Sequence, residues 1–228
     1  MSESTQAQIA YEKLRADLLA CRLVPGERVR MNEAVDRLDV NLGAVREALS
    51  RLAAEGLVIA TQQRGFRAAP ISVRDLKDLT PVRIEIEISC LRRSLRNGDL
   101  AWETHLVAAF HKVSKTPIFD EGSPNRASET FARAHDEFHG ALVAACDNTW
   151  LLRIRDTLYT QWERYRRLAV QLPNIERDLN AEHRELFNAA MERDENKIAS
   201  LISDHFNKTT EILLSATDFL DIENDHSA

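Results

Sequence analysis

The chain has 228 residues, a formal net charge of −6, 44% hydrophobic residues and 29% charged residues. This balance indicates a soluble globular protein of one or two domains, and no apolar run approaches the ~20 residues that a membrane span requires. The three cysteines lie far apart without a CxxC pair, which argues against a disulfide framework and against a thiolate zinc site. Because the N-terminus lacks the basic-then-apolar order of a signal peptide, we expect a cytoplasmic protein with no membrane partner.

Charge is unevenly distributed along the chain. Residues 1–75 hold eleven Lys and Arg against ten Asp and Glu, whereas the remainder holds 19 against 26. Phosphate contacts depend on local charge, so the less acidic N-terminal third can bind nucleic acid if its arginines share one face.

Three helices and a hairpin are predicted at the N-terminus. Apolar spacing predicts a helix over residues 6–20, which Pro25-Gly26 separates from a second helix at "NEAVDRL". A third helix over about 43–55 has Gly56 as its C-terminal stop. The stretches "LVIAT" and "FRAAP", joined by "QQRG", then predict a two-stranded hairpin that ends at Pro70. This order predicts a winged helix-turn-helix over residues 1–70.

The third helix has the features of a DNA recognition helix. Asn41 stands at its start, Gly43 allows close backbone approach, and Arg46 faces away from the apolar Val45 and Leu49. Any one such arginine is more often a solvated surface charge, but their shared motif favours DNA contact. The further candidates for DNA binding are Arg30, Asn32, Arg64 and Gly65.

The rest of the chain has helical periodicity and no further strand signal. About six helices are predicted over residues 76–220, interrupted at "RNGD", "TPIFDEGSPN", "CDN" and "LPN". Residues 71–75 are predicted as a linker, "SVRD" as a helix N-cap, and residues 221–228 as a frayed tail. The predicted fold class is therefore mainly α, a winged helix-turn-helix followed by an all-α helical bundle.

Four histidines fall on apolar faces of the predicted helices. A lone inward histidine is usually a core residue, but four in one core need partners for their ring nitrogens. A divalent metal ion would supply that partner. The predicted metal ligands are His135, His139, His183 and His205. Asp136, three residues before His139, is an alternative oxygen ligand in place of His135.

The N-terminal segment resembles a known family in three motifs. "PGERV", "VREALSRLAAEGLV" and "RGF" resemble the DNA-binding domain of the GntR family of bacterial transcription regulators. The family usually has Ser-Arg after the valine and often Pro before "VREAL", where this chain has Asn41, Leu42 and Ala44. Because an arginine is lost at Leu42, the operator sequence cannot be borrowed from relatives.

The helical remainder resembles the FCD effector domain that defines the FadR subfamily. The resemblance rests on "VRIEIEISCLRRSL", "HDEFHGALVAACDNTWLLRI" and "EHRELFNAAMERDENKIASLISDHF". It implies a metal site of Asp-x3-His and two later histidines, in which His135 here takes the aspartate's position. It also implies that Arg83 pairs with a ligand carboxylate, and the alternative is an ion pair between Arg83 and a glutamate.

These features predict a regulator and not an enzyme. We expect a homodimer that binds double-stranded operator DNA as a repressor and is released by a small organic acid. The acid would bind at a divalent ion, zinc first and nickel or copper next. One alternative is a metal-dependent hydrolase with a DNA-binding head, although no general base stands out. The other is a regulator that senses the metal itself.

Overall fold

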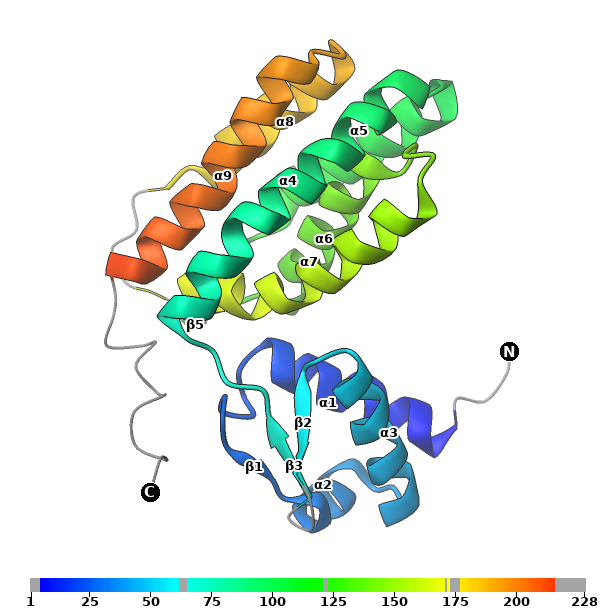
Figure 1. Ribbon diagram of the computed structural model, residues 1–228, viewed down its shortest axis with the longest axis vertical. Helices are drawn as coiled ribbons and strands as arrows, with labels where there is room; N and C mark the ends of the chain where they lie inside the picture. The colour runs from blue at the N-terminus through cyan, green and yellow to red at the C-terminus, as the bar shows by residue number, and fades with distance from the viewer. Residues whose placement is uncertain (1–4, 62–64, 121–122, 171, 173–176, 216–228) are drawn as a thin grey trace. The chain divides into compact units, whose positions relative to one another are not determined.

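The computed structural model describes residues 5–61, 65–120, 123–170, 172 and 177–215 (Figure 1). These residues fall into two compact units. The winged unit contains residues up to 76 together with 160–168, and the helical unit contains residues 77–159 and 169–215. Most of the described residues are helical, so the predicted mainly α fold class is confirmed.

The winged unit confirms the predicted winged helix-turn-helix. Its elements in chain order are α1 (Gln6–Leu19), β1 (Arg28–Val29), α2 (Met31–Leu38), α3 (Leu42–Ala54), β2 (Val58–Thr61) and β3 (Gly65–Ala68). The hairpin strands β2 and β3 pair antiparallel, and β1 adds to the other edge of β3. The strand β1 was not predicted, because two residues are too few to show an alternating pattern.

The core of the winged unit lies between α3 and the helices α1 and α2. Leu14 on α1 and Val45, Leu49 and Leu52 on α3 are fully buried. Thr5 caps α1 by accepting a hydrogen bond from Gln8 N at 3.2 Å. The predicted stop of α3 is confirmed, since Gly56 follows the helix with φ +73°, a conformation that suits glycine.

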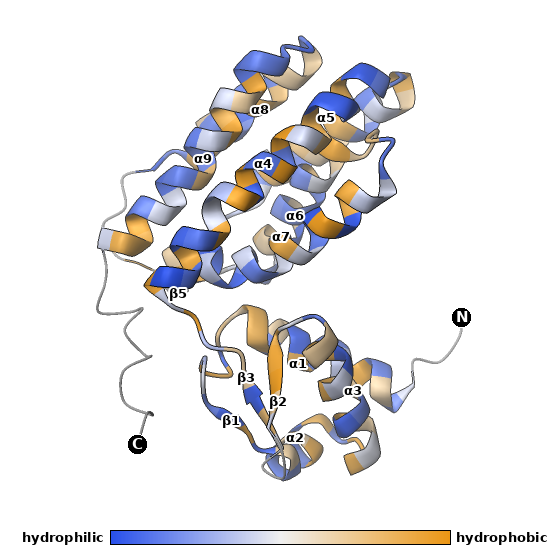
Figure 2. Cartoon of the chain, viewed as in Figure 1, coloured by the Kyte–Doolittle hydropathy of each residue, from blue (hydrophilic) through white to orange (hydrophobic). Residues whose placement is uncertain are grey.

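Six helices follow β3 among the described residues. They are α4 (Val73–Asn97), α5 (Leu100–Lys115), α6 (Glu129–Val143), α7 (Thr149–Val170), α8 (Leu179–Met191) and α9 (Glu195–Ser215). Within the helical unit α5 packs against α6 and α8, and α8 packs against α9. Hydrophobic and hydrophilic residues alternate around these helices (Figure 2), as expected when one face of each helix is buried.

Three boundaries differ from the predictions. The segment 71–75, predicted as a linker, is helical from Val73, and Ser72 Oγ caps the helix by accepting a hydrogen bond from Asp75 N at 3.0 Å. A short hairpin of β4 (Phe119–Asp120) and β5 (Ser123–Ala127) lies where no further strand was predicted, because so short a pair has no readable periodicity. The break between α8 and α9 occurs at Arg193, with φ 55° and no glycine or proline to signal it.

At the C-terminal end the structure describes residues up to 215. The predicted tail, residues 221–228, lies outside the described residues. Among the helices that the structure describes, none combines the length and the apolar character that a membrane-crossing segment requires.

Candidate functional site

The four predicted histidines converge from three helices. His135 and His139 lie one turn apart on α6, His183 lies on α8 and His205 on α9. All four are buried, with at most 4% of their surface exposed. One nitrogen from each ring can be chosen so that all four lie within 4.8 Å of one another. We refer to these four residues as the histidine cluster.

The cluster forms because each helix turns an apolar face inward and places a histidine on it. On α6 the neighbours of His135 and His139 along this face are the buried Phe131, Phe138 and Leu142. The ring centroid of His139 is 4.4 Å from that of His135, 5.5 Å from that of His183 and 5.2 Å from that of His205. His139 is therefore close to all three of the others.

His139 is the residue whose chemistry most requires a ligand. Its side chain is fully buried, and within the described part of the chain neither Nδ1 nor Nε2 has a hydrogen-bond partner. Burial, with smaller contributions from His205 and His183, holds the pKa of His139 well below its usual range. The ring is therefore neutral at physiological pH and keeps a lone pair that can bind a metal ion.

A carboxylate outside the cluster orients His205. Glu182 Oε2 lies 2.7 Å from His205 Nδ1, and since a carboxylate only accepts, the Nδ1–H donates and the lone pair stays on Nε2. Arg177 holds this carboxylate through two bonds, Nε to Oε1 at 3.0 Å and Nη2 to Oε2 at 2.7 Å. This arrangement matches the outer partners that orient histidine ligands in metal sites.

The pKa shifts of this pair reflect burial and mutual contact. Burial lowers the pKa of His205 to about 4, although the hydrogen bond to Glu182 opposes this shift. Burial raises the pKa of Glu182, but its hydrogen bonds with His205 and Arg177 outweigh that effect and hold the pKa well below its usual range. Glu182 is therefore ionised, as an outer partner of a metal ligand should be.

Sequence reasoning missed Glu182 and Arg177. Glu182 directly precedes His183, yet its carboxylate contacts His205, which is 23 residues later on another helix. No spacing rule connects these two residues, so the signal exists only in the packing of α8 against α9.

Two buried arginines add positive charge near the cluster. The Arg83 guanidinium is 3.8 Å from the ring centroid of Phe206, and its charge contributes to lowering the pKa of both His139 and His205. Arg155 donates to the backbone oxygen of His139 at 3.0 Å and forms an ion pair with Glu87, also at 3.0 Å. The charge of Arg155 is thus compensated inside the protein.

The alternative ligand Asp136 does not join the cluster. His135 is buried with the other three histidines, whereas Asp136 is exposed on α6. Neighbouring residues on a helix point about 100° apart, so both side chains cannot face the same centre. The structure therefore corrects the alternative in which Asp136 replaces His135.

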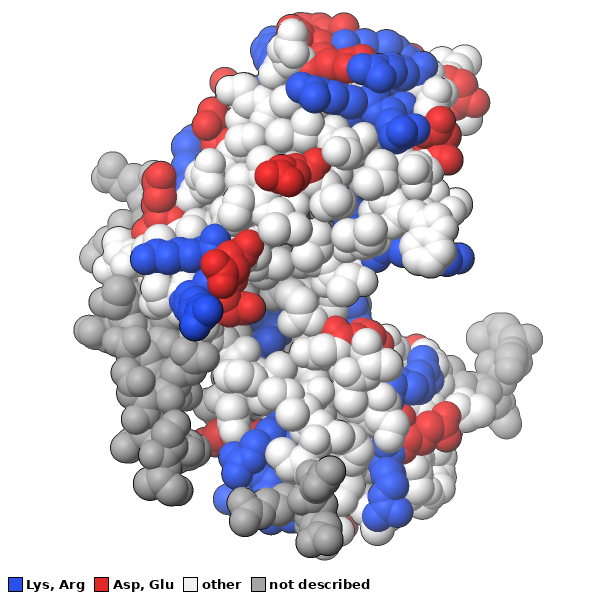
Figure 3. All heavy atoms as spheres, viewed as in Figure 1, with Lys and Arg blue, Asp and Glu red and all other residues white. Residues whose placement is uncertain are grey.

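In the winged unit Arg46 lies where the sequence predicted it. It is exposed on α3, while Val45 and Leu49 are buried on the other side. Among the described residues, the guanidinium of Arg46 has no hydrogen-bond or ion-pair partner. On the face of this unit drawn in Figure 3, Lys and Arg form separate groups and not one continuous basic stripe. DNA binding by this unit therefore depends on individual arginines that are available for contact, such as Arg46.

Asn41 and Gly43 shape the start of α3. Asn41 Oδ1 accepts a hydrogen bond from Ala44 N at 2.9 Å, and its Nδ2 donates to Gln6 Oε1 at 2.6 Å. A Cβ atom at Gly43 would lie 3.1 Å from Asn41 Oδ1, which is tighter than ordinary contact. Both residues therefore have a structural role in the N-cap besides the DNA contact that was predicted for them.

The other DNA-binding candidates gather beside the wing. Arg30 and Asn32 are exposed at the start of α2, and Arg30 forms an ion pair with Glu33 at 2.9 Å. Together with Gly65, which has φ +84°, they line a hollow of about 410 Å³. Arg64 lies outside the described residues.

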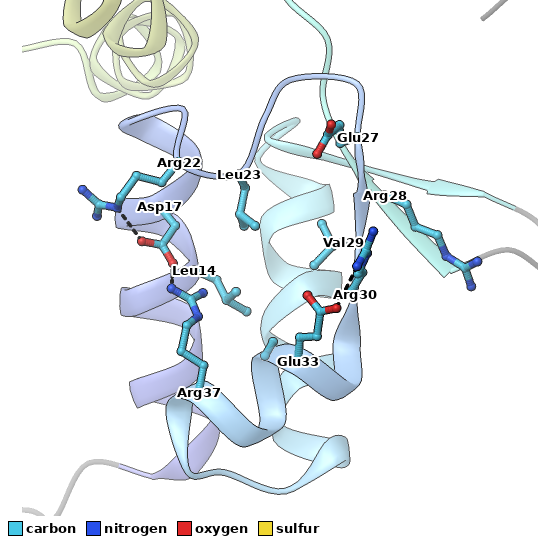
Figure 4. Close-up of a pocket in the computed structure, with 11 residues that line it drawn as sticks. Leu14, Asp17, Arg22, Leu23, Glu27, Arg28, Val29, Arg30, Glu33 and Arg37 are labelled. Carbon is cyan, nitrogen blue, oxygen red and sulfur yellow. Dashed lines mark hydrogen bonds and ion pairs between the residues drawn. The ribbon is translucent and has the colours of Figure 1, made fainter.

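A second hollow of about 320 Å³ lies between α1, β1 and α2 (Figure 4). Asp17 on α1 is buried there between two arginines, 2.7 Å from Arg22 Nε and 2.6 Å from Arg37 Nη1. The lining holds both signs of charge, and these ion pairs join α1 to the end of α2. We interpret the ion pairs around this hollow as structural contacts that hold α1 against α2.

A winged helix-turn-helix followed by a separate helical unit is the organisation of a two-domain DNA-binding protein. Residues 6–67 match the bacterial regulatory proteins of the gntR family, and residues 78–208 match the FCD domain. The chain therefore belongs to the GntR family, with an FCD domain, and is a DNA-binding transcription regulator and not an enzyme.

Similar proteins match the chain over most of its length. The chain is 35% identical to the HTH-type transcriptional regulator BphR of Paraburkholderia xenovorans over 90% of this chain and 84% of that protein. It is 30% identical to the HTH-type transcriptional repressor GlaR of Escherichia coli K12 over 86% of this chain and 90% of that protein. The solved structure of E. coli McbR/YncC has a TM-score of 0.74 at 16% identity, covering 93% of this chain and 98% of that one, which shows a shared fold.

Proposed function

We propose that this chain is a dimeric repressor that a small organic acid releases from its operator by binding at a divalent metal ion in the histidine cluster. The observation that carries the proposal is His139, fully buried among three other histidines with neither ring nitrogen bonded to a described residue. A buried polar group without a partner costs about 1–3 kcal/mol, so a ligand at this point would relieve a real penalty.

The cluster fits a divalent ion in size and in donor chemistry. Four nitrogens placed tetrahedrally about 2.0–2.1 Å from zinc are about 3.3 Å apart. Nitrogens that already lie within 4.8 Å of one another would have to move inward to reach that spacing. Imidazole suits zinc, nickel and copper, and we place zinc first. His135, His139, His183 and His205 would hold the ion.

An acid is the favoured effector because the surroundings are positively charged. Four neutral imidazoles leave the charge of a divalent ion uncompensated, and the buried Arg83 adds to it. When bound, the ion would supply a positive centre that attracts a carboxylate. Arg83 would pair with the carboxylate group, since a guanidinium can form two parallel hydrogen bonds with it.

The direction of regulation is proposed from relatives. GlaR and RspR of E. coli K12, 30% and 25% identical to this chain, are both named transcriptional repressors. We therefore propose repression, with Arg46 on α3 reading a base and Arg30, Asn32, Asn41, Gly43, Arg64 and Gly65 supporting the contact.

We propose a homodimer because a two-fold operator requires two winged units. Trp150 and Ile154, 69% and 43% exposed, lie one turn apart on α7 and offer apolar surface. Sedimentation of the full chain at micromolar concentration tests this. A monomer both free and on operator DNA would contradict the proposal.

A titration of the chelated protein tests the metal and the acid together. Metal content is measured by elemental analysis, and operator binding is followed with zinc alone, with a panel of short mono- and dicarboxylates alone, and with both. We expect release only when both are present. Release by zinc alone would favour a metal sensor, and no metal uptake at all would overturn the site.

The variant His135→Asp sharpens this titration. It introduces a carboxylate that partly neutralises the ion, so metal should bind at least as well while the acid binds more weakly. If the acid binds equally well to both proteins, the ion's charge is not what attracts it.

A further inference from the structure

Leu42, the first residue of α3, is 40% exposed. The other large apolar residues of α3, Val45, Leu49 and Leu52, are fully buried. A single exposed leucine is ordinary on a protein surface, so exposure alone decides nothing. What matters is its position, since Leu42 lies one helical turn before the exposed Arg46 and on the same side of the helix.

The exposed face of α3 has little other chemistry at its start. Asn41 already uses its side chain to cap the helix and to bind Gln6. Gly43 has no side chain, and Glu47 carries a negative charge that phosphates repel. Leu42 and Arg46 are therefore the two side chains of this turn that can approach base edges without a competing intramolecular bond.

We propose that Leu42 is a specificity-determining residue that packs against the C5 methyl group of a thymine in the operator. This inference rests on the proposed role of α3 as the recognition helix. Thymine alone presents a methyl group in the major groove, and a leucine side chain has no donor or acceptor with which to read any other base. The contact therefore selects T·A against the other three base pairs.

The helix geometry also places that thymine relative to the base read by Arg46. Residues four apart on a helix have Cβ atoms about 5–6 Å apart. Base pairs rise about 3.4 Å each along one strand. The thymine therefore lies one or two base pairs from the base that Arg46 is proposed to read.

Removal of the methyl group alone tests this contact. The full-length protein is used to select an operator from a random duplex pool, and each thymine of that operator is then replaced in turn by uracil, which lacks only the methyl. We expect one thymine in each half-site whose replacement weakens wild-type binding about three- to five-fold. This factor corresponds to the free energy of about 0.8 kcal/mol for burial of one methyl-sized group.

Two variants decide whether Leu42 makes the contact. Leu42→Ala should bind the thymine and uracil operators equally and should melt at the wild-type temperature, because the side chain is exposed. Ile59→Ala is the matched control, since Ile59 is an isomeric side chain that is 47% exposed on β2. It should keep the full response to uracil.

The outcomes separate this inference from the proposed function. If the wild type enriches a sequence but no thymine responds to uracil, or if Leu42→Ala keeps the response, the methyl contact is wrong and operator binding stands. If the wild type enriches no sequence, sequence-specific operator binding is itself wrong, and the role of Leu42 fails with it.

Discussion

The winged unit and the histidine cluster differ in where they leave a polar side chain without a bonding partner. In the winged unit the buried Asp17 meets Arg22 and Arg37, and Arg46, which has no bonding partner among the described residues, faces solvent. In the cluster the unpartnered group is His139, which is completely buried. Both regions thus leave bonding capacity unused, one on the surface and one in the interior.

The difference decides how each region depends on its ligand. Water satisfies an exposed guanidinium, so the winged unit is complete before DNA arrives. A buried imidazole has lost its water, so the helical unit carries a penalty until something binds. Removal of the metal should therefore destabilise the helical unit of the free protein, whereas substitution of an exposed DNA-contacting side chain should change DNA affinity and leave the stability of the free protein unchanged.

Metal removal should have the largest effect. A ligand present at 100 to 1,000 times its Kd stabilises the folded state by about 2.7–4.1 kcal/mol. We expect the calorimetric transition of the helical unit to move to lower temperature on chelation and to return with added zinc. Identical transition temperatures with and without zinc would contradict stabilisation of the helical unit by a metal ion in the histidine cluster.

His139→Ala should abolish most of the metal affinity. Loss of an outer partner alone typically costs about 10- to 100-fold, and loss of a ligand should cost more. Calorimetric titration with zinc measures it, and His111→Ala, an exposed histidine on α5, is the control. Operator binding by the metal-free protein should be unchanged, and full metal content in the variant would contradict the prediction.

Arg46→Ala should weaken operator binding by about 1–3 kcal/mol and reduce sequence preference. The loss should appear on the operator and be smaller on random DNA, as measured by gel shift. Equal losses on both duplexes would make Arg46 a phosphate contact. Metal binding should not change, which separates the two regions directly.

Glu182→Gln should lower zinc affinity about ten-fold, at the low end for an outer partner. Glutamine still accepts a hydrogen bond from His205 but loses the negative charge that Arg177 and the ring both face. The control is Glu185→Gln, an exposed glutamate on the same helix. A similar change in both variants would mean that Glu182 acts only through overall charge.

Asp17→Asn should have the smallest effect. Arg22 and Arg37 are 39% and 51% exposed, so water screens both ion pairs, and we expect a loss of about 0.5–1 kcal/mol in the stability of the winged unit. Urea unfolding measures the loss, with the exposed Asp36→Asn as control. A loss of metal affinity here would contradict the independence of the two regions.

Local patterns explain why the winged unit was predictable. The three helices, the stop at Gly56 and the hairpin each depend on residues within a few positions of one another. The strand β1 was not predictable, because its two residues form a strand only by pairing with the distant β3. The β4–β5 hairpin was not predictable either, because β4 has two residues and neither strand has an alternating apolar pattern.

By itself the sequence determined the class of the chain and the identity of the inward histidines. Helical periodicity requires that residues on one apolar face point the same way, so His135 and His139 could be assigned to a buried face of one helix without coordinates. Family motifs determined the DNA-binding unit in the same way, since they depend on short stretches of the chain.

Only the tertiary structure decided which groups meet. That four histidines share one centre and that Glu182 orients His205 both depend on how α6, α8 and α9 pack. The rotation of one helix against another is set by the shapes of many side chains at once. No spacing within a single helix contains that information.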